Sequence, residues 1–170
     1  MISKIIEFLQ KREWKFTQDS NIIRFPVSHF NATYNCVIDI REERLLMIFL
    51  SFGGTFCPPE KQQAVINLFN RMNTSLGYGN FELATEEGQG LIKFRTSNFF
   101  TNTELDDSII DKVIDINTGI IDFSMPYILK VIFGGMDVDE AFKELAPQPN
   151  LITENVTHEE DKEQEEPHDA

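Results

Sequence analysis

Apolar residues recur at helical spacing at the start of the chain and at strand spacing soon after it. Residues 2–13 carry an apolar side chain every three or four positions, which predicts an amphipathic helix. Two short β-favouring pieces follow between residues 14 and 27, on either side of a turn-like run at residues 18–21. The pattern predicts one helix and then a hairpin.

The next two segments predict neighbouring strands of different character. Residues 34–41 alternate apolar and mostly polar side chains, as in a strand with one buried face. Glu42 and Glu43 should then turn the chain. Residues 44–52 are apolar on both faces, so this strand needs cover on both sides. A partner or second subunit could supply that cover, and so could a central position inside a two-layer domain.

The second half of the chain predicts helices around another hairpin. An apolar stripe predicts a helix over residues 59–76, and residues 81–96 predict two strands joined by a glycine-containing loop. Residues 105–108 offer capping side chains for a helix that should run to about residue 123, and Pro126 should then kink or restart it. Asp137 can cap a last short helix. Strands and helices come in blocks, which favours an α+β fold with an antiparallel sheet packed against helices.

The composition changes at Pro147, which predicts two regions. Residues 1–146 form the expected domain, with 14 basic and 20 acidic side chains. Residues 147–170 carry one Lys and eight Asp or Glu, and their only aliphatic residues larger than alanine are Leu151, Ile152 and Val156. We expect a disordered acidic tail there. It could be an interaction segment or a solubilising terminus.

Charge and cysteine content exclude several classes of protein. A formal charge of −13 argues against nucleic acid as the main partner, because phosphate binding depends on Lys and Arg. Cys36 and Cys57 are the only cysteines, too few for a disulfide framework or a structural zinc site, and we expect both to be buried. The first residues lack the apolar run of a signal peptide, and no segment is long enough to span a membrane. The expected location is therefore the cytoplasm.

Residues suited to catalysis are sparse. His29 is the one histidine outside the tail and has no evident metal or nucleophile companion in the sequence. Gly53 and Gly54 follow a strand but lack the spacing of a phosphate-binding loop, so a β-bulge or tight turn explains them better. The acidic pairs lie at predicted turns or a helix cap, where carboxylates stay solvated. We therefore expect no catalytic residues, no metal site and no cofactor.

The order of several motifs resembles the YbjN-type domain family over roughly residues 1–145. The resemblance rests on residues 66–73, 79–83 and 90–95, and on a C-terminal pattern that includes Asp122 and Pro126. Further residues of this pattern are Ile128, Val131, Gly134, Gly135, Glu140 and Ala141. The resemblance implies a fold similar to type III secretion chaperones, which are small α+β proteins that commonly dimerise and hold partner polypeptides. It carries no catalytic residues over to this chain.

Two functions fit these observations. The first is a homodimeric, non-catalytic module that binds another protein through the doubly apolar strand and its neighbours, with Val37, Met47 and Phe49 as the expected contact residues. The alternative is a small-molecule sensor with a pocket between the sheet and the helices. An exposed apolar patch would favour the first, and a cavity with converging polar groups would favour the second.

Overall fold

The computed structural model describes residues 1–100 and 105–145 of the chain. The predicted acidic tail over residues 147–170 lies outside the described residues. The helices are α1 (Ile2–Lys11), α2 (Pro59–Ser75), α3 (Asp107–Ile132) and α4 (Val138–Leu145), and a 3-10 turn, η1, spans Glu42–Arg44. The strands are β1 (Thr17–Asp19), β2 (Ile22–Ser28), β3 (Thr33–Arg41), β4 (Leu46–Cys57), β5 (Asn80–Glu86) and β6 (Gln89–Phe99). The predicted α+β class is confirmed.

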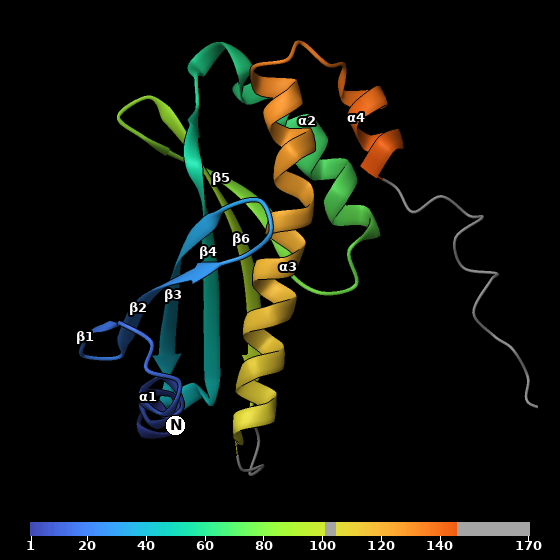
Figure 1. The fold of residues 1–170 in the computed structure, drawn as a ribbon. Coiled ribbons are helices and arrows are strands. Elements are labelled where there is room, and N and C mark those ends of the chain that lie inside the picture. Colours follow the sequence, from blue (N-terminus) through green and yellow to red (C-terminus); the bar gives the residue numbers. More distant parts are fainter. Residues whose placement is uncertain (101–104, 146–170) are drawn as a thin grey trace, which may run out of the picture.

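The strands form one six-stranded sheet in the order β1-β2-β3-β4-β6-β5, and every neighbouring pair is antiparallel. The long strand β4 lies near the centre (Figure 1). Each edge has one feature that limits pairing with another strand. The strand β1 has only three residues, and on β5 the side chain of Asn73 bonds to the backbone N–H and C=O of Phe81 at 2.8 and 3.0 Å.

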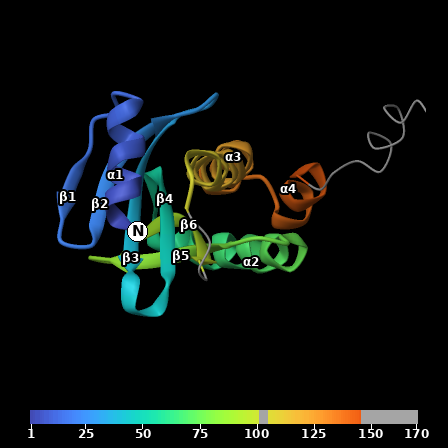
Figure 2. The same cartoon turned by 90° about the horizontal axis from the view of Figure 1, so that it is seen from below.

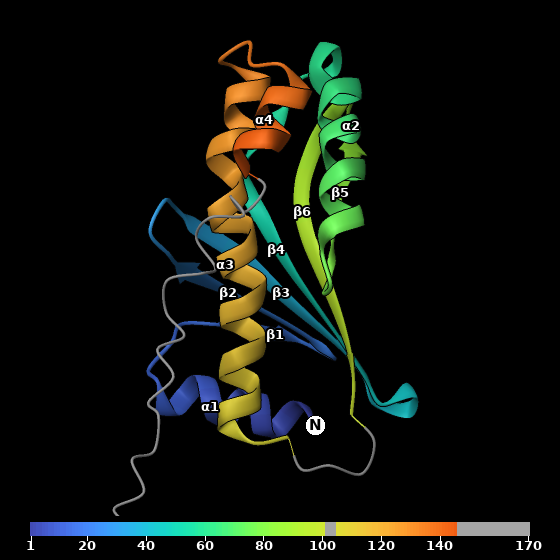
Figure 3. The same ribbon diagram turned by 90° about the vertical axis from the view of Figure 1, so that its right-hand side faces the viewer.

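The four helices pack on one face of the sheet. Figure 3 shows α3 running along the sheet, with α1 near its lower end and α2 and α4 near its upper end. From below, α2, α3 and α4 are grouped on one side of the strands (Figure 2). Trp14 is partly buried and contacts the buried rings of Phe8 and Phe25, which joins α1 to the same face of β2. The result is a two-layer domain with its core between the helices and the sheet.

A buried polar contact fixes α3 against the centre of the sheet. The Asn117 side chain is fully buried, and its amide donates to the Phe49 carbonyl at 3.3 Å and to the Thr96 hydroxyl at 3.1 Å. Its carbonyl oxygen accepts a hydrogen bond from Ser51. Because every polar atom of this amide has a partner, the network sets the position of α3 over β4 and β6.

The helix α3 also approaches β4 closely at Gly53. A Cβ atom added at Gly53 would lie 3.1 Å from the Met125 sulfur. The pairing between β4 and β6 shifts register between Phe52 and Phe56, where the sequence predicts a β-bulge or tight turn at Gly53 and Gly54. The glycine therefore allows close packing of helix on sheet.

Pro126 lies inside α3, so the predicted restart of the helix does not occur. Proline has no amide hydrogen, and the carbonyl of Asp122 four residues earlier loses its helical donor. The side-chain amide of Asn31, in the loop between β2 and β3, donates to that carbonyl at 3.0 Å. The helix passes through Pro126 because a residue far away in the sequence replaces the missing donor.

Candidate functional site: the open face of the sheet

The strand β4 shows what covers each face of the sheet. Met47, Phe49 and Ser51 point toward the helices and are buried. Leu46, Leu50 and Phe52 point to the opposite face, and each keeps part of its surface accessible. No helix of residues 1–100 or 105–145 packs on that second face. The strand is apolar on both faces, as the sequence predicts, but only one face receives cover from the described chain.

We call the apolar residues of this second face the open-face stripe. Its members are Val37, Leu46, Ile48, Leu50, Phe52, Phe56, Leu91 and Phe99. Strand register places Leu50 opposite Val37, Leu46 opposite Phe99, and Phe56 opposite Leu91. The two end residues are the most accessible, with Phe56 52% and Phe99 72% exposed. The stripe follows β4 and extends onto β3 and β6.

Charged side chains flank the stripe on β6 and β5. Lys93 and Arg95 lie beside Phe52 and Leu50, and both approach the Glu82 carboxylate, at 2.8 and 3.4 Å. Burial by itself raises the pKa of Glu82, but hydrogen bonds from Lys93 and Asn80 and the charge of Arg95 bring that pKa below its usual value. Glu82 is therefore ionised at neutral pH. An apolar centre with a charged rim is the usual anatomy of a protein–protein contact.

The structure places the three predicted contact residues on different faces. Val37 is partly exposed on the open face, whereas Met47 is 1% and Phe49 0% exposed beneath the helices. Partner contact through these residues stays a prediction, but the face assumed for Met47 and Phe49 is corrected. Four residues separate the paired Arg41 and Leu46, so even-numbered residues of β4 share a face with Val37. With this loop length, Leu46, Leu50 and Phe52 are the residues of β4 that lie on the same face as Val37. A loop one residue shorter or longer would move every side chain of β4 to the opposite face.

A polar cluster around Asp122 joins the β2–β3 loop to α3, at a position that the sequence analysis did not identify as a cluster. The buried Asp122 carboxylate accepts hydrogen bonds from the Tyr34 hydroxyl at 2.9 Å, the Asn31 amide N–H at 2.9 Å and the Asn31 side chain at 3.1 Å. His29 Nδ1 lies 3.2 Å from the same carboxylate. Burial by itself raises the pKa of Asp122, but the bonds from Asn31 and Tyr34 and the approach of His29 bring it below its usual value. We refer to these four residues as the Asp122 cluster.

The contacts of the Asp122 cluster indicate a structural role. Burial raises the pKa of the Tyr34 hydroxyl, and its bond to Asp122 raises it further, so Tyr34 stays protonated and remains a donor. Three of the residues hold a loop against a helix. The carboxylate has its partners within the protein, so it is poorly placed to act on a substrate.

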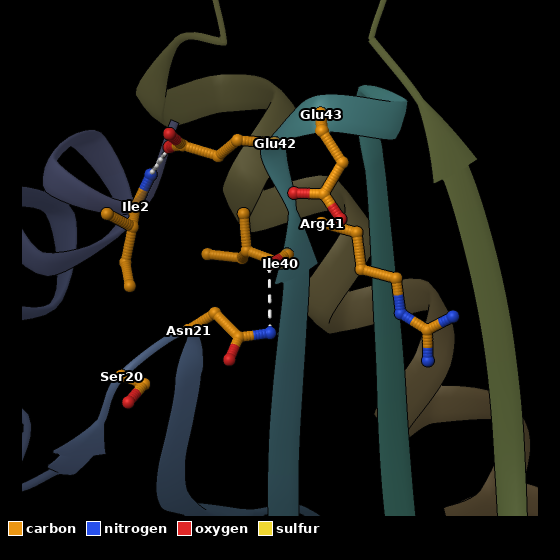
Figure 4. Close-up of a pocket in the computed structure, with 7 residues that line it drawn as sticks. All are labelled: Ile2, Ser20, Asn21, Ile40, Arg41, Glu42 and Glu43. Carbon is orange, nitrogen blue, oxygen red and sulfur yellow. Dashed lines mark hydrogen bonds between the residues drawn. The ribbon is translucent and has the colours of Figure 1, made fainter.

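A polar hollow of about 420 Å³ lies where α1, the turn between β1 and β2, the end of β3 and η1 meet (Figure 4). The Glu42 carboxylate accepts a hydrogen bond from the Ile2 N–H at 3.1 Å, and the Asn21 side chain donates to the Ile40 carbonyl at 3.0 Å. A hydrogen bond from the Met1 amino group is the main cause of the lowered pKa of Glu42. These contacts tie the ends of three elements together, and the hollow offers exposed carboxylates rather than an enclosed site.

A second cavity has a different character. A groove of about 310 Å³ lies between α2, α3 and α4. Its apolar lining consists of Met72, Leu76, Ile120, Phe123, Phe142 and Leu145. We call it the interhelical groove.

Other chemistry has little support among the described residues. Residues 1–100 and 105–145 contain no group of three or more His, Cys, Asp or Glu side chains arranged to hold a metal ion. Cys36 and Cys57 are both buried and free, as predicted, and burial raises the pKa of the Cys36 thiol to about 12. Such a thiol is rarely ionised and reacts slowly. Among the described helices, none combines the length and apolar character that crossing a membrane requires.

Comparison with known proteins identifies the fold. No family model and no curated protein matches the chain. Among solved structures, the crystal structure of YbjN from E. coli, described as a candidate transcription regulator, matches 79% of this chain and 90% of that chain, with a TM-score of 0.57 and 10% identity. This chain has a YbjN-type fold. At so low an identity the similarity to YbjN shows the fold alone.

Proposed function

We propose that this chain is a non-catalytic protein-interaction module, chaperone-like or regulatory, that binds another polypeptide through the open-face stripe. The observation that carries the proposal is an apolar stripe that no described helix covers: Phe56 and Phe99 are exposed and Leu46, Leu50 and Phe52 partly accessible, while Ile48 between them is buried. Soluble monomers rarely leave such a contiguous patch bare without a use. The location we propose is the cytoplasm, where the two free cysteines stay reduced.

The geometry of the stripe favours a polypeptide over a small molecule. It lies on a sheet face rather than in a closed cavity, and its most exposed members, Phe56 and Phe99, are at its two ends. Aromatic side chains at a flat surface supply large contact areas at a small entropic cost. Lys93, Arg95 and Glu82 at the rim would set the orientation of the partner.

A small-molecule sensor is the second candidate, and the interhelical groove favours it. The volume of about 310 Å³ is at the lower end of the range for ligand pockets. Its walls are mainly apolar, with Ser75 and Ser124 as polar side chains. A ligand there would be small and largely apolar.

The binding proposal predicts that charge on the stripe abolishes partner capture. A Phe56→Glu/Phe99→Glu variant should lose tenfold or more of its specifically captured protein, since burying two carboxylates costs several kcal/mol. The measurement is affinity capture with the full chain from native lysate, quantified by mass spectrometry.

A matched control separates this effect from a change in net charge. Phe30→Glu/Phe133→Glu alters two phenylalanines outside the stripe, which are 94% and 67% exposed. It should capture the same protein at the same level as the unaltered chain. Equal capture by both double variants would refute binding through the stripe.

Self-association through the same face is a separate prediction. If the stripe pairs two copies, the unaltered chain should sediment as a dimer and Phe56→Glu/Phe99→Glu as a monomer, because the interface would bury four carboxylates. Sedimentation velocity or light scattering across a wide concentration range measures this. A monomer at every concentration for the unaltered chain would remove dimerisation and leave the stripe to another protein.

A further inference from the structure

The interhelical groove lies where the described chain ends. Leu145 is both the last residue of α4 and part of the groove wall. The helix α4 packs against α2 and α3, and the groove extends to Leu76 beside α2 and to Gly119 on α3. Residues that follow Leu145 therefore start from the groove itself.

The sequence after α4 is unfavourable for further helix. Pro147 and Pro149 follow at once, and a residue before proline is disfavoured in the helical conformation. Leu151 and Ile152 lie six and seven residues after Leu145, so they reach up to about 20 Å from the groove wall.

We propose that Leu151 and Ile152 fold back and occupy the interhelical groove of their own chain. Only three tail residues are aliphatic and larger than alanine, and two of them are adjacent at this distance from the groove. The groove offers mainly apolar walls, including Phe123 and Phe142. Removing both apolar surfaces from water drives the contact.

Because Leu151 and Ile152 are tethered to the domain, even a weak contact is enough to keep the interhelical groove filled. A short linker gives an effective concentration on the order of 1 mM, so an intrinsic dissociation constant below that value keeps the groove mostly filled. The acidic residues that follow stay in water, and the contact should be insensitive to ionic strength. The docked segment would compete with any small apolar ligand for the groove. This inference is independent of the proposed function, because the open-face stripe lies on the opposite face of the sheet.

Paramagnetic relaxation in the full chain tests the contact. A nitroxide on Asn155→Cys should reduce the amide signals of Gly119 and Phe123 roughly twofold or more, since they would lie well within its range in the docked state. Cys36 and Cys57 are buried and should not take up the label. Adding Leu151→Asp/Ile152→Asp should restore the signals, whereas the charge-matched Thr153→Asp/Thr157→Asp should leave them reduced. Phe123→Ala, on the groove side at an exposed position, should restore the Gly119 signal.

Results other than those expected above would overturn the proposal. Unreduced signals in the labelled chain, or signals still reduced after Leu151→Asp/Ile152→Asp, would show that these two residues do not fill the groove. Mixing isotope-labelled chain with nitroxide-labelled chain separates the source of the effect. Broadening of similar size in that mixture would assign the groove to a segment of a second copy instead.

Discussion

Replacing Asp122 with alanine should destabilise the fold by about 3 kcal/mol. The change leaves the buried Tyr34 hydroxyl and the Asn31 amide without their acceptor. It also weakens the position of Asn31, whose side chain supplies the donor that Pro126 lacks. Urea denaturation followed by circular dichroism measures the loss, which is a large part of the 5–15 kcal/mol typical of a domain.

Two further variants test whether the loss of stability comes from the Asp122 cluster. Asp115→Ala makes the same change on an exposed position of the same helix and should cost less than about 0.5 kcal/mol. Tyr34→Phe removes one hydrogen bond from the cluster and should cost roughly 1–2 kcal/mol. A cost for Asp122→Ala no larger than that of Asp115→Ala would show that the cluster does not hold the β2–β3 loop.

The same cluster should make stability depend on pH. The folded-state pKa of Asp122 lies below its usual value, so its ionised form stabilises the native state. This contribution is complete above the unfolded-state value of about 3.9 and is lost as the pH falls through the folded-state value. The difference in free energy of unfolding between the unaltered chain and Asp122→Ala should therefore shrink below about pH 4.

Local patterns in the sequence predicted most elements because one buried face imposes its spacing on each of them. The helical spacing of Ile5 and Leu9 reflects their burial in α1, and the alternation in residues 34–41 reflects a strand with one face in the core. Residues 105–108 indicated a helix cap, and in the structure the Asp106 side chain accepts the Ile109 N–H at 2.9 Å. Such signals lie within a few residues of the element they define.

Contacts between residues far apart in the sequence could not be predicted from local patterns. The continuity of α3 through Pro126 depends on Asn31, and 91 residues separate Asn31 from Asp122. A proline in isolation indicates a break, and only the folded arrangement shows the replacement donor. The Asp122 cluster went unrecognised for the same reason, since its members come from a loop, a strand and a helix.

The open-face stripe is an intermediate case. Residues 44–52 showed that both faces of β4 are apolar, but which face the helices cover depends on the register with β3. That register follows from a loop of four residues ending at Leu45, which adopts a left-handed conformation with a φ of 49°. No residue type before Leu46 predicts this loop length. The sequence therefore indicated the right strand and left the choice of face open.

Adjacent residues of β4 should consequently respond in opposite ways to substitution. Phe49→Ala should cost about 3–5 kcal/mol, because the ring is fully buried and its loss leaves a cavity beneath α3. The ring also packs edge-on against Phe25 at a centroid distance of 6.0 Å, a contact that alanine cannot make. Chemical denaturation of the full chain measures the cost.

Leu50→Ala is the matched change one residue further along the strand. Leu50 keeps part of its surface accessible on the open face, so its truncation should cost less than about 1 kcal/mol. Its effect should appear instead as weaker capture of the partner protein, because Leu50 lies at the middle of the stripe beside Val37. If Leu50→Ala proved as destabilising as Phe49→Ala in a monomeric sample, something would cover the open face within the chain itself. Unchanged stability in Phe49→Ala would mean that the two faces had been assigned the wrong way round.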